Sequence, residues 1–425
     1  MKTSIIPQNT ERGTTLKGGL LTNLFRNGLF KRLNTLEFGQ ITLVENVEEF
    51  RFGRCTEEFP TPVKLIVHST EFYSDIALGG SVGAGEAFIH GFWSCDDLTL
   101  LIRILLKNRH ALDAMDSSLS RIKTPLHKLM HWYNRNTKNG SRRNIESHYD
   151  LGNELFKTFL DESMMYSSAV YEEKNYDLEK AAFAKVDRIC KKLDLKPGDH
   201  VLEIGTGWGG FAIHAAKYYG CRVTTTTISR EQFVHARDRV KEEGLTDKVT
   251  LLLEDYRDLS GQYDKLVSIE MIEAIGHQYL DTYFDTCNRL LKPHGMMLLQ
   301  AITIADQRYE TAKNTVDFIK RFIFPGGFLP SVAAMADSIA RKTDMRIYHL
   351  EDIGEHYATT LRHWRQRFFS RIDDVRQLGY PDSFVRMWDF YLSYCEGGFL
   401  ERVIGTAQIL TIKPENRRDP VTPVI

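Results

Sequence analysis

The sequence predicts an α/β protein with a doubly wound, mostly parallel sheet, preceded by a smaller α+β domain. Two observations predict this class. From about residue 145, short apolar runs alternate with amphipathic helical segments, which is typical of a parallel sheet with helices on both faces. Before that point, runs with a period of two are separated by Gly, Asn and Pro, which indicates the strands of a small mixed domain.

Composition limits the class of protein further. A chain of 425 residues with 42% hydrophobic content can bury a large core and divide into two domains. Its net charge of −1 gives no overall field that favours nucleic acid. Six scattered cysteines without a C-x-x-C pair argue against a disulfide framework and a metal site. Without a secretory signal or an apolar stretch of about 20 residues, the expected location is cytoplasmic.

The first domain is expected over residues 16–125, after a disordered tail at 1–15 and before a linker at 126–146. Residues 20–33 predict a basic amphipathic helix, since Leu and Phe recur at helical spacing with Arg26, Lys31 and Arg32 between them. Strands are predicted at 38–45, 48–53 and 63–69. We expect these elements to form a small domain that engages lipid.

Basic charge is concentrated between Leu101 and Glu146, where ten Lys or Arg residues face three acidic ones, a net charge of about +7. Such a segment can simply be the solvated face of a helix. However, each cation gains about 1 kcal/mol beside an anionic leaflet, while Leu and Phe enter the interface. We therefore expect peripheral contact with the inner face of a membrane.

The second domain is expected over residues 147–415, followed by a tail at 416–425. Strands are predicted at 200–205, 222–228, 249–255, 263–272 and 296–304. Helices are predicted at 209–220, 230–245 and 279–295. Ligands of such sheets bind beyond the carboxyl ends of the strands, at the point where the strand order reverses.

The stretch "EIGTGWGG" at 203–210 lies at that point. Gly205 and Gly207 permit a tight turn with the backbone close to a ligand. The spacing differs from the dinucleotide fingerprint G-x-G-x-x-G. Glu203, two positions before the first glycine, is placed to attract the ammonium of an amino acid. The pattern resembles motif I of S-adenosylmethionine-dependent methyltransferases.

Over residues 20–410 the chain resembles the cyclopropane-fatty-acyl-phospholipid synthase family. The motifs that carry this resemblance are "HYDLGNELF", "MMYSSAVY", "LEIGTGWGG", "TISREQ", "EDYRDL", "SIEMIEAIG", "FIFPGGFLP" and "YATTLRHWRQRF". The resemblance implies a seven-stranded methyltransferase sheet with a helical acyl-chain insertion around 305–335. It also implies S-adenosylmethionine as the co-substrate, a bilayer with unsaturated acyl chains as the partner, and leaves a homodimer open.

The resemblance carries the family's contacts with the methyl donor onto this chain. They are Tyr166, Ser167, Gly205, Gly207, Thr227, Gln232, Tyr256 and Arg257. Taken singly, a tyrosine such as Tyr166 can be a core aromatic and Thr227 an ordinary strand residue. Taken together, the set favours a donor site.

The reaction needs a base after methyl transfer, because attack of an alkene on the sulfonium methyl leaves a carbocation. In the family the base is taken to be a bound bicarbonate. Glu273 and Tyr357 match the residues that hold it, whereas Ser168 replaces a cysteine and Gln300 a histidine. Ser and Gln still offer hydrogen bonds, but Gln cannot titrate.

These departures leave the product open. Proton loss from the added methyl closes a cyclopropane, and proton loss from a neighbouring carbon gives a methyl-branched alkene. An inactive lipid-binding relative and a soluble small-molecule methyltransferase are the remaining alternatives.

Overall fold

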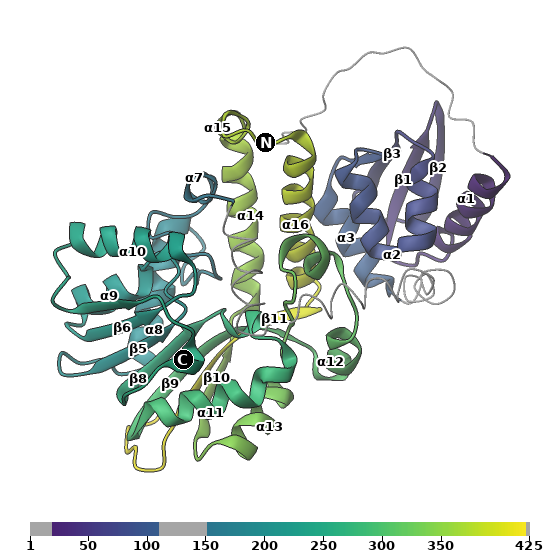
Figure 1. Ribbon diagram of the computed structural model, residues 1–425. Coiled ribbons are helices and arrows are strands. Elements are labelled where there is room, and N and C mark those ends of the chain that lie inside the picture. Colours follow the sequence, from purple (N-terminus) through teal and green to yellow (C-terminus); the bar gives the residue numbers. More distant parts are fainter. Residues whose placement is uncertain (1–18, 110–150, 422–425) are drawn as a thin grey trace. The chain divides into compact units, whose positions relative to one another are not determined.

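The computed structural model describes residues 19–109 and 151–421. They form two compact units, each of which is discontinuous in sequence (Figure 1). Unit 1 contains the described part of residues 1–130 together with residues 316–322 and 379–401. Unit 2 contains the described part of residues 131–315 together with residues 323–378 and 402–425.

Unit 1 is centred on a four-stranded mixed sheet in the order β2-β1-β3-β4. Its strands are β1 (Gly39–Glu45), β2 (Glu48–Arg54), β3 (Val63–Val67) and β4 (Trp93–Cys95). β1 is antiparallel to β2 and parallel to β3. Alternate residues of β1 are buried, among them Ile41 and Leu43, as the period of two predicted.

The helices of unit 1 are α1 (Leu20–Leu33), α2 (Glu71–Ile89), α3 (Leu98–Lys107) and α16 (Asp382–Leu400). α16 packs against both α2 and α3. The contacts are close: a Cβ atom on Gly397 would lie 2.7 Å from Ile102, and one on Gly85 would lie 2.4 Å from the ring of Phe318. Two late segments of the chain therefore complete the core of the first unit.

Unit 2 contains a seven-stranded sheet in the order β10-β11-β9-β8-β5-β6-β7. Its strands are β5 (His200–Ile204), β6 (Arg222–Thr226), β7 (Val249–Leu252), β8 (Tyr263–Ile269), β9 (Leu291–Ile304), β10 (Arg346–Asp352) and β11 (Ile404–Ile412). The strands from β9 to β7 are parallel, and β11 is antiparallel to both β9 and β10. The order reverses at β5 and β8, where a ligand is expected.

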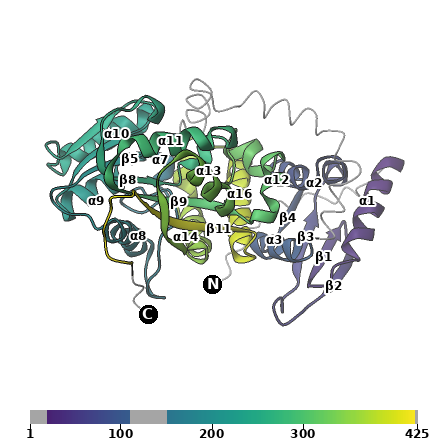
Figure 2. The ribbon, with the colours of Figure 1, turned by 90° about the horizontal axis from the view of Figure 1, so that it is seen from below.

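Helices cover both faces of this sheet. One apolar cluster joins it to α8 (Leu178–Lys192), α9 (Gly210–Tyr218) and α10 (Arg230–Glu242). The other joins it to α11 (Leu280–Leu290) and α13 (Val332–Lys342). Adjacent residues of β5 divide between the clusters, because Val201 belongs to the first and Leu202 to the second. α8 and α11 lie on opposite sides of the sheet (Figure 2).

Shorter helices and one long helix complete unit 2. They are α7 (Asn153–Phe156), α12 (Asp306–Lys313), α14 (Gly354–Ser370) and α15 (Ile372–Gln377). α14 packs on β11. Tyr357 lies on this helix, and its hydroxyl reaches Glu270 at the carboxyl end of β8.

The predicted fold class is confirmed, and all five strands located in the sequence are present. The helix predicted at 279–295 is wrong at its end: α11 stops at Leu290, and β9 begins at Leu291, two residues before Pro293. β10 and β11 were not located from the sequence. The tails at 1–15 and 422–425, the linker at 126–146 and most of the basic segment lie outside the described residues, and the predicted domain boundaries stay a prediction.

In the part of the chain that the structure describes, no helix combines the length and the apolar character that a bilayer span requires.

Candidate active site

The turn after β5 brings backbone close to any ligand at the reversal of strand order. Gly205 and Gly207 have φ angles of +102° and +52°, which side chains rarely adopt. A Cβ atom on Gly205 would also lie 3.2 Å from the Met271 side chain. The backbone N–H groups of Gly205 and Thr206 both donate to the Thr226 carbonyl at 3.0 Å. The loop is thus held open by the neighbouring strand.

Glu203 is buried at the end of β5 and receives little support from the protein. The Thr225 hydroxyl donates to its Oε2 at 2.6 Å. Burial raises the pKa of Glu203 to about 8, although the Thr225 hydroxyl and the Lys185 ammonium oppose the shift. A cationic ligand would stabilise the ionised form.

The predicted donor contacts beyond β6 and β7 are also at the carboxyl edge of the sheet. The Thr227 hydroxyl donates to Gln232 Oε1 at 2.9 Å, and both residues are buried. Tyr256 is buried, and its hydroxyl has no hydrogen-bond partner among the described residues. The Arg257 guanidinium is engaged by Asp255, with Nε–Oδ1 and Nη2–Oδ2 distances of 2.7 and 2.6 Å.

Tyr166 and Ser167 lie in a segment without regular structure before α8. The centroid of the Tyr166 ring lies 5.2 Å from the ring centroids of both Phe156 and Trp364. The Ser167 hydroxyl accepts a hydrogen bond from Lys185 Nζ at 2.8 Å. Lys185 is fully buried, and burial lowers its pKa to about 8 against the attraction of Glu270, Asp161 and Glu203.

Three of the four predicted catalytic residues, namely Ser168, Gln300 and Tyr357, form hydrogen bonds with one carboxyl group, that of Glu270. Gln300 Nε2 donates to Glu270 Oε1 at 2.8 Å. The backbone N–H of Ser168 donates to the same oxygen at 3.0 Å, while the Ser168 hydroxyl donates to the Ala169 carbonyl. The Tyr357 hydroxyl donates to Glu270 Oε2 at 2.8 Å. Both carboxylate oxygens are therefore engaged.

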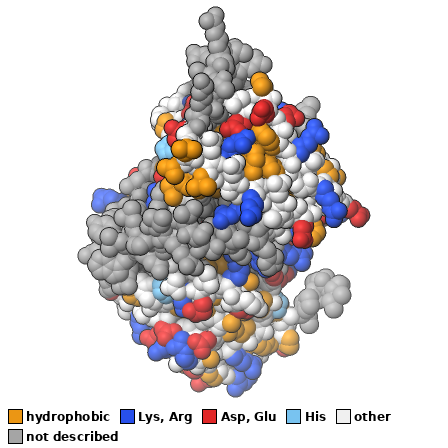
Figure 3. All heavy atoms as spheres, turned by 90° about the vertical axis from the view of Figure 1, so that its right-hand side faces the viewer, with side chains coloured by type: hydrophobic (Ala, Val, Ile, Leu, Met, Phe, Trp, Pro, Cys, Tyr) orange, Lys and Arg blue, Asp and Glu red, His pale blue; other side chains and the backbone are white. Residues whose placement is uncertain are grey.

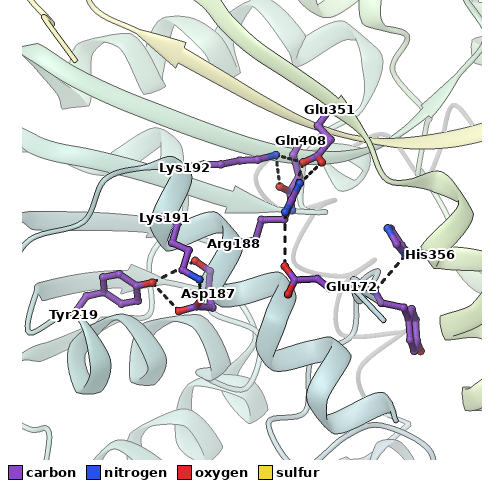
Figure 4. A network of polar contacts seen from close by, with 10 residues as sticks. Glu172, Asp187, Arg188, Lys191, Lys192, Tyr219, Glu351, His356 and Gln408 are labelled. Carbon is purple, nitrogen blue, oxygen red and sulfur yellow. Dashed lines mark hydrogen bonds and ion pairs between the residues drawn. The ribbon is translucent and has the colours of Figure 1, made fainter. Parts of the chain in front are cut away.

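The orientation of the Gln300 amide is set by a buried relay. Gln300 Oε1 accepts from Gln408 Nε2 at 2.9 Å, and Gln408 Oε1 accepts from Lys192 Nζ at 2.7 Å. Figure 4 shows Lys192 between Gln408 and Glu351, beside Arg188, which also pairs with Glu351. Because an ammonium can only donate, each amide in the relay turns its oxygen toward Lys192 and its NH₂ toward Glu270.

Glu273, the fourth predicted residue, has different partners. Its Oε1 accepts from the backbone N–H of Ile302 at 2.5 Å, and its Oε2 is buried without a partner among the described residues. Burial and the adjacent Glu270 raise its pKa to about 8. Glu273 is thus mainly protonated at neutral pH.

Sequence reasoning missed Glu270, Lys185 and Gln408. Glu270 follows the last residue of β8, and an acidic side chain at the carboxyl end of a parallel strand was a usable signal. Lys185 interrupts the apolar stripe of α8, which was a second signal. Gln408 carries no local signal, because its strand was not located.

Comparison with solved structures defines the class of the protein as S-adenosylmethionine-dependent methyltransferase. The mycolic acid cyclopropane synthase CmaA1 complexed with SAH and CTAB superposes with a TM-score of 0.61 and 30% identity, over 64% of this chain and 98% of that chain. The cyclopropane synthase MmaA2 from Mycobacterium tuberculosis gives a TM-score of 0.60 and 28% identity over the same shares.

The chain belongs to the mycolic acid cyclopropane synthetase family, whose model matches residues 136–409. It is 38% identical to the tuberculostearic acid methyltransferase UfaA1 of M. tuberculosis, over 80% of this chain and 81% of that protein. It is also 38% identical to the cyclopropane-fatty-acyl-phospholipid synthase of Escherichia coli K12, over 82% of this chain and 87% of that protein. The predicted family is thus confirmed.

S-Adenosylmethionine is the co-substrate of this enzyme family, and the residues present fit it. The left-handed turn at Gly205 and Gly207 can approach the donor closely, and Glu203 forms no direct ion pair among the described residues, so the donor's ammonium can supply one. The unpartnered Tyr256 hydroxyl offers a further polar contact. The donor supplies an electrophilic methyl on sulfur.

Proposed function

We propose that the enzyme transfers a one-carbon unit from S-adenosylmethionine to a cis double bond of an unsaturated phospholipid acyl chain and forms a cyclopropane. The observation that supports this is the carboxyl group of Glu270, which three hydrogen-bond donors hold directly after β8, the strand next to β5. Ring closure needs a proton acceptor held in place without solvent. A methyl transfer to nitrogen or oxygen forms no carbocation, so it needs no base placed to take a proton from carbon.

The residues around the donor also suit a cationic intermediate. Tyr166 contacts a group of aromatic rings: Phe156, Phe159, Phe324 and Trp364. Aromatic faces attract positive charge and exclude water. In this proposal, Tyr166 and Ser167 border the donor, and Thr227, Gln232, Tyr256 and Arg257 lie along its adenosine part.

The substrate is proposed to come from an anionic phospholipid bilayer. Three leucines at the start of α1 are exposed: Leu20 by 93%, Leu21 by 69% and Leu24 by 64%. Lys31 is exposed on the same helix. In the view of Figure 3, hydrophobic side chains lie among Lys and Arg side chains. Leucines in the interface and cations at its surface are typical of a peripheral contact.

The bilayer contact is tested with the full-length protein and vesicles of phosphatidylglycerol. The double variant Leu21→Asp/Leu24→Asp should lose flotation with the vesicles. Leu378→Asp, at an exposed leucine of unit 2 (45% exposed), serves as the control and should float like the wild type. Equal flotation of all three proteins would remove α1 from the contact.

The chemical product is tested by proton NMR of lipids extracted after reaction with S-adenosylmethionine. Upfield cyclopropane methylene signals are expected. A vinyl methyl signal without them would support a methyl-branched alkene, the alternative favoured by the similarity to UfaA1. Mass alone cannot separate the two, because each adds one CH₂. Donor binding in calorimetry without any lipid product would instead favour a soluble acceptor, and absence of donor binding an inactive relative.

A further inference from the structure

Bicarbonate, the base that the family resemblance implies, does not fit the hydrogen-bonding groups of this site. The Tyr357 hydroxyl has one hydrogen, and it is directed to Glu270. The two hydrogens of the Gln300 amide are directed to Glu270 and, at 3.4 Å, to the Ser168 carbonyl. The Ser168 N–H also points at Glu270. A second anion would find these donors occupied and a carboxylate among them.

We propose that the carboxylate of Glu270 is the base of the reaction and replaces bicarbonate in this enzyme. Bicarbonate and a glutamate side chain present the same functional group, a delocalised carboxylate with two acceptor oxygens. The proposal rests on the proposed transfer to an acyl double bond and specifies the group that completes it.

The backbone of Glu270 supports a functional role. Its φ angle is +49°, in the left-handed region that a β-carbon disfavours. The Glu270 N–H donates to the Gln300 carbonyl at 2.7 Å, which holds this conformation. Glycine would adopt this conformation without strain. A glutamate here therefore points to a function of its side chain that offsets the strain in the backbone.

The hydrogen-bond donors around Glu270 favour its ionised form. The relay from Lys192 presents only N–H groups to Glu270, and an acceptor-only group is the partner that such donors require. The buried Lys185 ammonium adds an attractive charge, whereas Glu273 opposes it unless protonated. The pKa of Glu270 is raised above its ordinary value, because withdrawal from water outweighs the three donors and Lys185, which lower it.

The proposed step balances as follows. The alkene π electrons form a bond to the donor methyl, the carbon–sulfur bond breaks, and S-adenosylhomocysteine leaves with its electron pair. The other alkene carbon becomes a cation. Glu270 takes a proton from the new methyl, and the electrons of that C–H bond form the third bond of the ring. Glu270 is left protonated and returns the proton to solvent after the product leaves.

Bicarbonate dependence provides the first test. Wild-type enzyme is assayed in CO₂-free buffer, with and without added bicarbonate, on vesicles of unsaturated phosphatidylglycerol with labelled donor. Equal rates are expected. A rate that rises more than about 10-fold with bicarbonate would overturn the proposal. No labelled lipid under either condition would contradict the proposed function itself, which separates the two failures.

Two variants then test the carboxylate directly. Glu270→Gln keeps the shape and should bind the donor while losing cyclopropane formation by at least about 100-fold, consistent with removal of a general base. Glu270→Gly removes the carboxylate, relieves the left-handed strain and vacates the acceptor position, so bicarbonate should restore activity to it. Full activity of Glu270→Gln, or donor binding by Glu270→Gly without rescue, would count against Glu270 as the base.

A matched control is available in the same unit. Glu179→Gln makes the same chemical change in a carboxylate that pairs with Arg367 and has no contact with the relay or with Glu270 among the described residues. It should melt at a lower temperature and keep its bicarbonate independence and its product. Loss of ring closure in this control as well would show that the effect of Glu270→Gln is not specific.

Discussion

Two glutamates on neighbouring strands of unit 2 are held in opposite ways. Glu203, in β5, receives one hydroxyl hydrogen bond, from Thr225, and burial raises its pKa to about 8. Glu270, directly after β8, receives donors from three distant segments, which lower its pKa against the larger effect of burial. A carboxylate that lacks protein donors needs a ligand to ionise, whereas one with several is prepared beforehand. We infer that Glu203 ionises when the methyl donor binds, whereas Glu270 is held in position before the substrate binds.

The largest effect that separates the two glutamates is expected from Glu203→Gln. This variant removes the charge that faces the donor's ammonium, so the Kd for S-adenosylmethionine should rise roughly 100-fold, the cost of about 2–3 kcal/mol for a charged hydrogen bond. Isothermal titration calorimetry measures it. Glu270→Gln is the comparison variant and should bind the donor like the wild type. Equal losses in both variants would show that the division of roles is wrong.

The pH dependence of donor binding sharpens the same contrast. Below pH 8 the Glu203 carboxyl is mainly protonated, so pairing with an ammonium releases a proton and affinity should rise about 10-fold per pH unit. Above about pH 8 the donor's own amine loses its proton, and affinity should fall again. Calorimetry in two buffers of different ionisation enthalpy measures the proton release. Glu203→Gln should abolish it, and an unchanged release there would assign the proton to another group.

A smaller effect is expected from Gln408→Leu, which interrupts the relay behind Glu270. Gln300 can then turn its oxygen toward the carboxylate, and loss of this donor raises the pKa of Glu270. The acidic limb of the rate profile should move to higher pH, and kcat should fall roughly 10-fold with the donor Kd unchanged. Gln408→Glu, which keeps an acceptor for Lys192, should not restore the profile because it cannot donate. A profile that does not move in Gln408→Leu would make the relay purely structural.

The smallest effect concerns stability and Glu273. Its folded-state pKa, about 8, lies above its ordinary value of 4.5, so the folded state binds a proton that the unfolded state releases. This contribution is complete below pH 4.5 and is lost as pH rises through 8. Glu273→Gln resembles the neutral acid at every pH. The difference in melting temperature between this variant and the wild type should therefore increase in favour of the variant between pH 5 and pH 8. The increase should be about 2–4 °C for each kcal/mol of stability that the wild type loses. A constant difference across this range would show that Glu273 is ionised in the folded protein.

Local patterns explain which parts of the site could be predicted. The Gly205 turn is encoded within a few residues, because a strand, a left-handed turn and a helix follow one another directly. Ser168 and Tyr357 lie in motifs that carry the family resemblance, and Gln300 was assigned through the same resemblance as the replacement of a histidine. Glu273 was found in the same way, although its partner proved to be the backbone of Ile302.

Glu270 shows why the rest could not be predicted. Its partner Ser168 lies 102 residues away in sequence, and Tyr357 lies 87 residues away. The strand that carries Gln408 was not located from the sequence, so the relay that orients Gln300 could not be predicted. Likewise, residues 379–401 read as part of the second domain, yet α16 packs against α2 and α3 of unit 1.

The sequence by itself determined the fold class, the positions of five strands, the glycine turn after the first of them and the family, because each depends on short-range periodicity or on contiguous motifs. Only the tertiary structure decided which anion the tyrosine, the amide and the backbone N–H hold. Hydrogen-bond donors are satisfied by whichever acceptor the fold brings within 3 Å, and that choice is made between strands and helices that are remote along the chain.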